Sequence, residues 1–451
     1  MVKLSSTREP KNRLACRSKP LTVLPLGGLA LLLLTLEARA DITHQPRSAA
    51  WSLLSRNYFL HNDFRGSSPT GQSYQEEWAQ GFIAEITSGF TPGTIGLGFD
   101  THGFLGLKLD GGRGHAGTGL LPLDTDGRAA DNYSSAGAAL KLRLGQSLLR
   151  YGEMTVETPV FDTSDKRLQP EYATGFLFES RDFAELNIQA GRFTRFKNQN
   201  ASSGRGDFTG YGASTQGSAI SFVGASLENE TPFGAALYAS QLDETWRQAY
   251  LNLHFQQGAL TLEGNLYKTR DQGEARVGEV DTLAYSLLTK YQVGSQAFTI
   301  AFQHVRGDTP FDFVGGDSIY LANSIKYADF NGPHERSWQA RYDIELDAIG
   351  IPNLTFMARY VSGRGIDGSK APSGGAYNPL SPVTGLPTPQ QGSGGRHWER
   401  DLELRYSIPS GPAKDLTLNL SHVSHRGNDV QAADDIDRVY LILEYPLKGW
   451  L

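Results

Sequence analysis

Residues 354–361 alternate strictly between two kinds of side chain, and this alternation limits the possible folds more than any other feature of the chain. Successive side chains of a β-strand point to opposite faces. One face would carry Leu354, Phe356, Ala358 and Tyr360, and the other Thr355, Met357, Arg359 and Val361. A strand of this kind separates an apolar environment from water. The pattern recurs along nearly the whole chain, as in a soluble sandwich or a membrane barrel.

The alternation predicts an all-β protein with at least fifteen strands. With 51 glycines and 47 aromatic residues, the composition suits strands joined by turns, and no window shows a helical apolar stripe. About 18 strands would leave roughly 23 residues for each strand and its connection, enough for tilted strands that cross a bilayer. The predicted strands include Phe82–Ser88, Thr94–Asp100, Ala138–Leu144, Ala184–Ala190, Ala219–Ser226, Ala235–Gln241, Ala249–Gln256, Leu260–Lys268, Leu283–Val293, Phe298–Val305, Ser337–Leu346, Leu354–Gly363, Arg400–Ile408, Leu416–Ser424 and Arg438–Pro446.

The connections between these strands alternate between short and long. Gly145–Ser147, Gln256–Gly258 and Gly294–Gln296 are near-minimal turns, whereas Gly307–Arg336 and Ser362–Glu399 are long polar excursions. Outer-membrane barrels have short periplasmic turns and long extracellular loops. The connections therefore favour an antiparallel transmembrane barrel, in one domain, over a sandwich.

Charged residues fix which way the strands face. Leu402, Leu404 and Tyr406 oppose Asp401, Glu403 and Arg405, and other strands show the same division. A Lys or Arg that faces the middle of a bilayer costs about 2–4 kcal/mol, so the charged faces must meet water and line a lumen. A soluble sandwich with a solvated charged face is the alternative. A soluble protein of this size would, however, include fully buried strands or helices that cover a sheet.

The first 40 residues have the pattern of a secretory signal peptide. Basic residues precede an apolar run from Leu21 to Leu36, which ends in Ala38-Arg39-Ala40. We expect a mature domain of residues 41–451 that begins at Asp41. Cys16 precedes the apolar run, so the mature protein would have neither a disulfide nor a thiolate site. Removing 7 basic and 2 acidic residues from the chain's 42 and 48 changes the net charge from −6 to −11, which excludes nucleic acid as an expected partner.

Several short segments, distributed in order over the mature chain, carry a resemblance to a known family. They are Arg56–Phe59, Glu77–Phe82, Gly117–Pro122, Pro159–Phe161, Gly307–Asp312 with Gly316–Ser318, Asp329–Pro333, Ser337–Asp343, Ser410–Leu416 and Glu444–Leu447. These segments resemble the OprD family of substrate-specific outer-membrane porins of Gram-negative bacteria. The resemblance implies an 18-stranded barrel in which loops three and seven fold inward.

The resemblance also implies which residues guide a substrate. A basic ladder on the barrel wall would bind the substrate carboxylate at Arg56, Arg143, Arg341 and Arg359, with Lys141, Arg150 and Arg405 also basic in this chain. Loop three corresponds to Pro159–Ala173, which includes Tyr172, and the loop-seven residues are Asp312, Asp317 and Ser318. Successive weak sites along a pore let a solute both enter and leave.

The expected function is substrate-selective, passive uptake of small carboxylate-bearing solutes such as amino acids, small peptides or aromatic acids. The alternatives are a general diffusion porin, a secreted soluble binding protein and a barrel-embedded hydrolase. Enzymatic activity is not expected because the chain has no G-x-S-x-G elbow. Passive transport needs neither a cofactor nor a metal. The expected partners are outer-membrane lipid and lipopolysaccharide, the substrate and the barrel assembly machinery, and the oligomeric state is left open between a monomer and a loose trimer.

Overall fold

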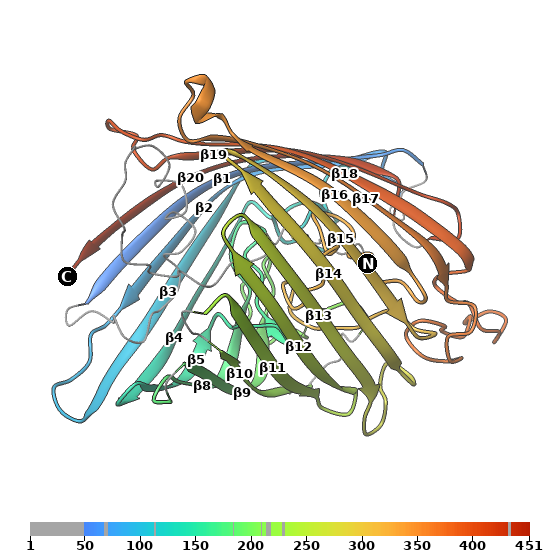
Figure 1. The fold of residues 1–451 in the computed structure, drawn as a ribbon, viewed down its shortest axis with the longest axis horizontal. Helices are drawn as coiled ribbons and strands as arrows, with labels where there is room; N and C mark the ends of the chain where they lie inside the picture. Colours follow the sequence, from blue (N-terminus) through green and yellow to red (C-terminus); the bar gives the residue numbers. More distant parts are fainter. Residues whose placement is uncertain are drawn as a thin grey trace.

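A computed structural model describes residues 49–66, 71–111, 114–183, 185–208, 210–212, 218–227, 231–431 and 434–451. The predicted signal peptide, Cys16 and the expected first mature residue Asp41 lie outside these residues. The described chain forms one barrel-shaped sheet (Figure 1).

Eighteen antiparallel strands make up the main sheet, and β6 and β7 form a separate two-stranded ribbon. The strands of the first half are β1 (Ala50–Phe64), β2 (Tyr74–Thr87), β3 (Ile95–Asp110), β4 (Asn132–Leu144), β5 (Ser147–Met154), β6 (Glu157–Thr158), β7 (Phe161–Asp162), β8 (Tyr172–Ser180), β9 (Leu186–Lys197) and β10 (Ile220–Leu227). Those of the second half are β11 (Phe233–Leu242), β12 (Trp246–Gln257), β13 (Leu260–Asp271), β14 (Asp281–Val293), β15 (Gln296–Arg306), β16 (Arg336–Glu345), β17 (Leu354–Asp367), β18 (Ser393–Ser407), β19 (Thr417–Gly427) and β20 (Ile436–Trp450).

The sheet closes on itself where the first strand meets the last. β1 and β20 pair without a register shift, from Ala50 opposite Trp450 to Phe64 opposite Ile436. Every other neighbour in the main sheet follows its partner in chain order. Closure satisfies the backbone groups that an edge strand would leave unpaired, which a structure in lipid requires.

Three predicted turns at one end of the barrel have the same form. Gly145-Gln146, Gly258-Ala259 and Gly294-Ser295 each join two strands as a two-residue turn, and each glycine has a φ of 58–60°. Such hairpin turns need a residue that tolerates positive φ, which glycine does. We call this end of the barrel the short-turn end and the opposite end the long-loop end.

The fifteen predicted strands are all present, but several were predicted too short. β3 continues to Asp110 rather than ending at Asp100. β17 continues to Asp367, and β18 already begins at Ser393. The connection predicted for Ser362–Glu399 is therefore shorter than expected. The missed parts of these three strands lie toward the long-loop end. There a strand extends beyond the bilayer and both faces can meet polar surroundings, so the alternation fades. β1, β5 and β8 were not among the fifteen.

The outer wall carries an apolar belt. Large side chains stand exposed on it, among them Leu140 at 67 % exposure and Ile300 at 61 %. Their sequence neighbours Lys141 and Ala301 are buried on the inner face. A soluble protein rarely exposes so many apolar side chains together, whereas lipid would cover them. Among the described residues no helix has the length and apolar character needed to span a membrane, and the one short helix is a 3₁₀ turn at Leu346–Ile349.

Candidate functional site

The connection between β5 and β8, residues 155–171, crosses the interior of the barrel. On one wall, the Tyr267 hydroxyl of β13 donates to the carbonyl of Pro159 at 2.8 Å. On the opposite wall, the Tyr58 hydroxyl of β1 donates to the carbonyl of Lys166 at 3.1 Å. This connection is the loop three of the sequence prediction, but it ends at residue 171 because Tyr172 and Ala173 already belong to β8, where they pair with β9 and β5.

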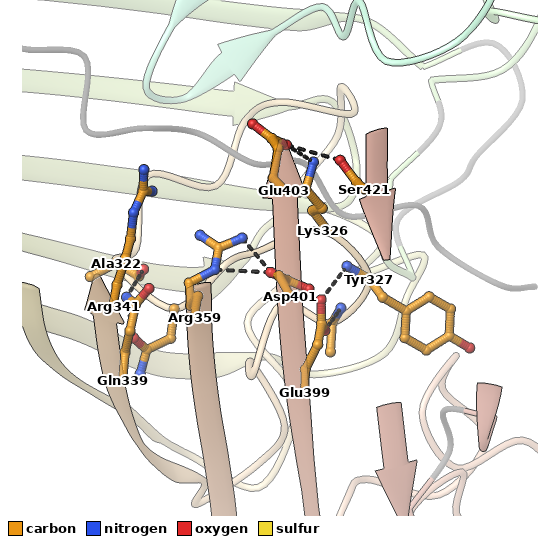
Figure 2. A network of polar contacts seen from close by, with 12 residues as sticks. Ala322, Lys326, Tyr327, Gln339, Arg341, Arg359, Glu399, Asp401, Glu403 and Ser421 are labelled. Carbon is orange, nitrogen blue, oxygen red and sulfur yellow. Dashed lines mark hydrogen bonds and ion pairs between the residues drawn. The ribbon is translucent and has the colours of Figure 1, made fainter. Parts of the chain in front are cut away.

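The connection between β15 and β16, residues 307–335, also crosses the interior. The Gln248 side chain of β12 donates to the carbonyl of Asp312 at 2.9 Å. Farther along, the Glu399 carboxylate of β18 accepts the backbone N–H groups of Tyr327 and Ala328 at 2.8 and 2.7 Å (Figure 2). Side chains on the inner wall therefore hold this loop across the lumen.

The two loops bind each other at six residues that we call the clasp: Asp162, Lys166, Glu171, Gly316, Asp317 and Ser318. The Glu171 carboxylate accepts the N–H groups of Ser164 and Gly316, both at 2.8 Å. The backbone N–H of Asp162 donates to the Ser318 hydroxyl at 2.7 Å, and Lys166 pairs with Asp317. The clasp narrows the lumen because it joins two segments that enter from different walls.

Burial raises the pKa of the Glu171 carboxyl from its usual 4.5 to about 7, and nearby Asp317 adds to this effect. The two N–H donors and Lys166 act in the opposite direction but do not cancel it. Both donors bind the same oxygen, Oε2, so a proton on Oε1 leaves both hydrogen bonds in place. The protonated side chain thus fits the clasp.

Raising the pH from about 5 to about 7 is expected to loosen the clasp. A Glu171 side chain released into water loses its proton near pH 4.5, whereas in the clasp it keeps the proton until about pH 7. The closed clasp therefore loses stability as the pH rises between these two values, and it loses no further stability above about pH 7. Open-channel current noise in planar bilayers should increase up to about pH 7 and then level off. Glu171→Gln, which keeps an acceptor oxygen without a titrating proton, should show no such rise. An equal rise in both proteins would contradict the assignment.

The basic residues predicted on β16, β17 and β18 all point inward and lie on neighbouring strands. Arg341 pairs with Asp343 of its own strand, Nη2 to Oδ1 at 2.6 Å. Arg359 is buried and donates from Nε and Nη2 to one oxygen of Asp401, at 2.9 and 2.6 Å (Figure 2). Arg405 differs, because it is half-buried and has neither an ion pair nor a hydrogen bond to any side chain that the structure describes.

A second group of predicted basic residues lies on β4 and β5. The buried Lys141 pairs with Asp100 at 2.6 Å, and Arg150 pairs with Glu179 at 2.6 Å. The half-buried Arg143 lies over the ring of Phe90, with 4.5 Å from Cζ to the ring centroid, and forms no ion pair with a described residue. This group and the β16–β18 group occupy separate parts of the inner wall.

The remaining predicted site residues lie at or near the loops. Arg56 is buried and binds Glu444, Asp165 and the carbonyl of Arg167. Tyr172 stacks on His102, with ring centroids 3.8 Å apart. Asp312 is buried and accepts the N–H groups of Gly212 and Phe313, whereas Asp317 and Ser318 belong to the clasp. The contacts of Asp312 and Ser318 hold backbone in place.

Sequence reasoning missed three basic residues that converge near β20. Arg167 of the first loop is buried, and its Nε and Nη2 have no hydrogen-bond partner in the described structure. Burial lowers the pKa of this guanidinium, and the nearby charge of Arg438 adds to the effect. Arg438 donates to Asn62 at 2.6 Å, and Lys326 of the second loop pairs with Glu403 at 2.5 Å. Of the three residues, only Arg167 carried a signal in the sequence, because it lies in the predicted loop three.

The comparisons with known proteins agree with this architecture. Residues 47–449 match the model of a family described as outer membrane porin, OprD family. Porin D of Pseudomonas aeruginosa is 40 % identical over 410 residues, which cover 88 % of this chain and 90 % of that protein. The crystal structure of P. aeruginosa OccK9 (OpdG) is 35 % identical and covers 91 % of this chain and 100 % of its own, with a TM-score of 0.80. The crystal structure of P. aeruginosa OpdK with vanillate is 36 % identical in sequence and has a TM-score of 0.78. The match covers 89 % of this chain and 99 % of that chain.

Proposed function

Since this chain belongs to the OprD family of substrate-specific outer-membrane porins, we propose that it takes up small solutes that carry a carboxylate group. The family places the protein in the outer membrane, among lipid and lipopolysaccharide. Its relatives are porins, which favours transport over hydrolysis. The carboxylate specificity and the roles of single residues are our proposal.

The unpaired guanidinium of Arg405 carries the proposal. It points inward from β18, is half-buried, and has no acidic partner in the described part of the chain. Guanidinium groups bind carboxylates with two parallel hydrogen bonds, and a cation without a counter-ion is available to a passing anion. Arg143 of β4 offers a second such group on a separate part of the inner wall. Two weak sites suit transport better than one tight site, which would block flux.

A solved relative supports the same solute class. Its structure was determined with vanillate, an aromatic carboxylate. The paired residues Arg341 and Arg359 share their charge with Asp343 and Asp401, so we assign them a lesser role in binding solute than Arg405. They would contribute to the potential along the wall rather than to a separate solute contact.

Arg405→Gln is expected to lower the selectivity for benzoate over benzamide several-fold in a liposome-swelling assay. The two solutes have the same ring and nearly the same size, so charge is the main difference. Arg247→Gln is the matched control, because Arg247 is an exposed arginine on the outer wall and its loss removes the same charge. Unchanged selectivity in Arg405→Gln would contradict the role of Arg405. A wild type that admits both solutes equally and shows a large conductance would instead indicate a general diffusion porin.

We also propose that residues 1–40 are removed on export. The basic, apolar and small-residue pattern of this segment supports cleavage after Ala40. N-terminal sequencing of the protein purified from outer membranes should begin at Asp41. A sequence that begins upstream of Ala40 would contradict this proposal.

A further inference from the structure

Four arginines gather on the outer wall at the long-loop end. Arg306, Arg336, Arg364 and Arg396 come from the neighbouring strands β15, β16, β17 and β18, and each is exposed. Arg336 lies directly opposite Arg364, and Arg364 directly opposite Arg396, in the registers of the two strand pairs. Each arginine has at least one sequence neighbour that is buried inside the barrel, such as Val305, Glu335, Gly363 and His397, so the arginine side chains point away from the lumen. We call these four residues the arginine row.

The arginine row has no acidic partner within the described residues. The nearby acids are engaged elsewhere. Glu335, next to Arg336 in sequence, is buried and pairs with His397, while Asp308 pairs with His334 and Asp281 with Lys268. Like charges directly opposite each other on adjacent strands destabilise a sheet. Three consecutive guanidiniums on one face therefore indicate a surface that an external anion neutralises.

Aromatic residues fix the depth of the arginine row in the membrane. Trp338 lies two residues from Arg336, and Trp398 two residues from Arg396, in both cases toward the short-turn end. Trp398 stacks on Tyr360 with ring centroids 5.8 Å apart, and Trp338 is 54 % exposed. Tryptophan and tyrosine of membrane barrels gather at the interface between hydrocarbon and headgroups. Two residues span about 7 Å along a strand, which places the arginines at the level of the headgroups.

A hollow beside the arginine row is large enough for a headgroup. It has a volume of about 590 Å³, and its lining includes Arg306, Arg336 and His304, the ion pair of Lys268 with Asp281, and the apolar Leu283. The basic side chains would face the charged part of a lipid, and Leu283 would face its hydrocarbon. The hollow thus has the mixed lining that a phosphorylated lipid needs.

We propose that the arginine row binds the phosphate groups of a glycolipid in the outer leaflet. Arginine suits this ligand because its planar fork forms two hydrogen bonds with a phosphate. The proposal rests on the outer-membrane location given above, with the long loops facing outward. It concerns the outer wall only, and is independent of which solute passes through the lumen.

The test measures lipid binding to the folded full-length protein in detergent by native mass spectrometry. The probes are lipid A with both phosphates and the same lipid after both phosphates have been removed. Arg336→Gln/Arg364→Gln/Arg396→Gln should bind the phosphorylated lipid on the order of a hundredfold more weakly, at about fivefold for each charge lost. Binding of the dephosphorylated lipid should be unchanged, and should be weak in both proteins. The single variant Arg364→Gln serves if the triple variant does not fold.

The matched control is Arg128→Gln/Arg205→Gln/Lys370→Gln, which removes the same charge from exposed positions outside the strands. Wild-type binding by the triple arginine variant, or an equal loss in the control, would overturn the proposal. Bilayer conductance separates this proposal from the transport function, because residues on the outer wall should leave the single-channel current unchanged. A wild type that conducts but binds no phosphorylated lipid would refute the arginine row alone.

Discussion

Replacing Asp401 with alanine is expected to lower the free energy of unfolding by about 3–5 kcal/mol. The variant leaves the Arg359 guanidinium buried without the carboxylate that binds it at 2.6 Å, and both side chains of this pair are almost fully buried. A buried charge without its partner keeps its desolvation cost and loses the compensating attraction. Denaturant unfolding in detergent micelles, followed by the gel mobility of the folded barrel, measures the change.

The double variant Arg359→Met/Asp401→Leu should recover most of this loss. Removing both charges removes the desolvation cost together with the attraction, so a well-packed apolar pair is often neutral. Asp243→Ala is the control, since Asp243 pairs with Arg192 on the exposed outer wall and should cost less than about 1 kcal/mol. A double variant as unstable as Asp401→Ala would show that the pair does not act as a unit.

Replacing residues 156–170 with a short Gly-Ser linker should raise the single-channel conductance several-fold. The segment crosses the lumen, yet it lies outside the 18-stranded ladder, and Met154 already pairs with Ala173 where the linker would begin and end. The barrel should therefore stay closed while the narrow region widens. A wide lumen lets solutes pass without touching Arg405, so the preference for benzoate over benzamide should disappear.

Deletion of residues 382–385 provides the control for this excision. These residues lie at an exposed tip of the connection between β17 and β18, where Val383 is 89 % exposed. Conductance and selectivity should remain those of the wild type. Unchanged conductance in the variant without residues 156–170 would show that another part of the chain sets the width of the pore.

The sequence predicted the elements whose signal is local. The alternation in residues 354–361 correctly predicted an outward Tyr360 and an inward Arg359, because side-chain direction depends only on the period of the strand. The turns at Gly145, Gly258 and Gly294 were also predictable, since a two-residue hairpin selects for glycine. The contact of Arg341 with Asp343 follows the same logic, as residues two apart on a strand share a face.

The sequence could not predict contacts that depend on register or on the path of a loop. Arg359 and Asp401 lie 42 residues apart and meet only because β17 and β18 pair in one particular register. Arg167 and Lys326 come from connections that cross the lumen, and no period in the sequence describes such a path. The roles proposed for Arg405 and Arg143 stay predictions, because they concern a solute rather than a contact within the chain.

The pairing of β1 with β20 sets a requirement on how the barrel forms. All other neighbours in the main sheet follow each other in the chain, so they can zip up one after another from nearby contacts. The β1–β20 seam joins residues almost 400 positions apart and needs both ends of the sheet in place first. It should therefore form last and limit the rate of assembly. We expect substitutions along this seam to slow barrel formation, even where the finished barrel is equally stable.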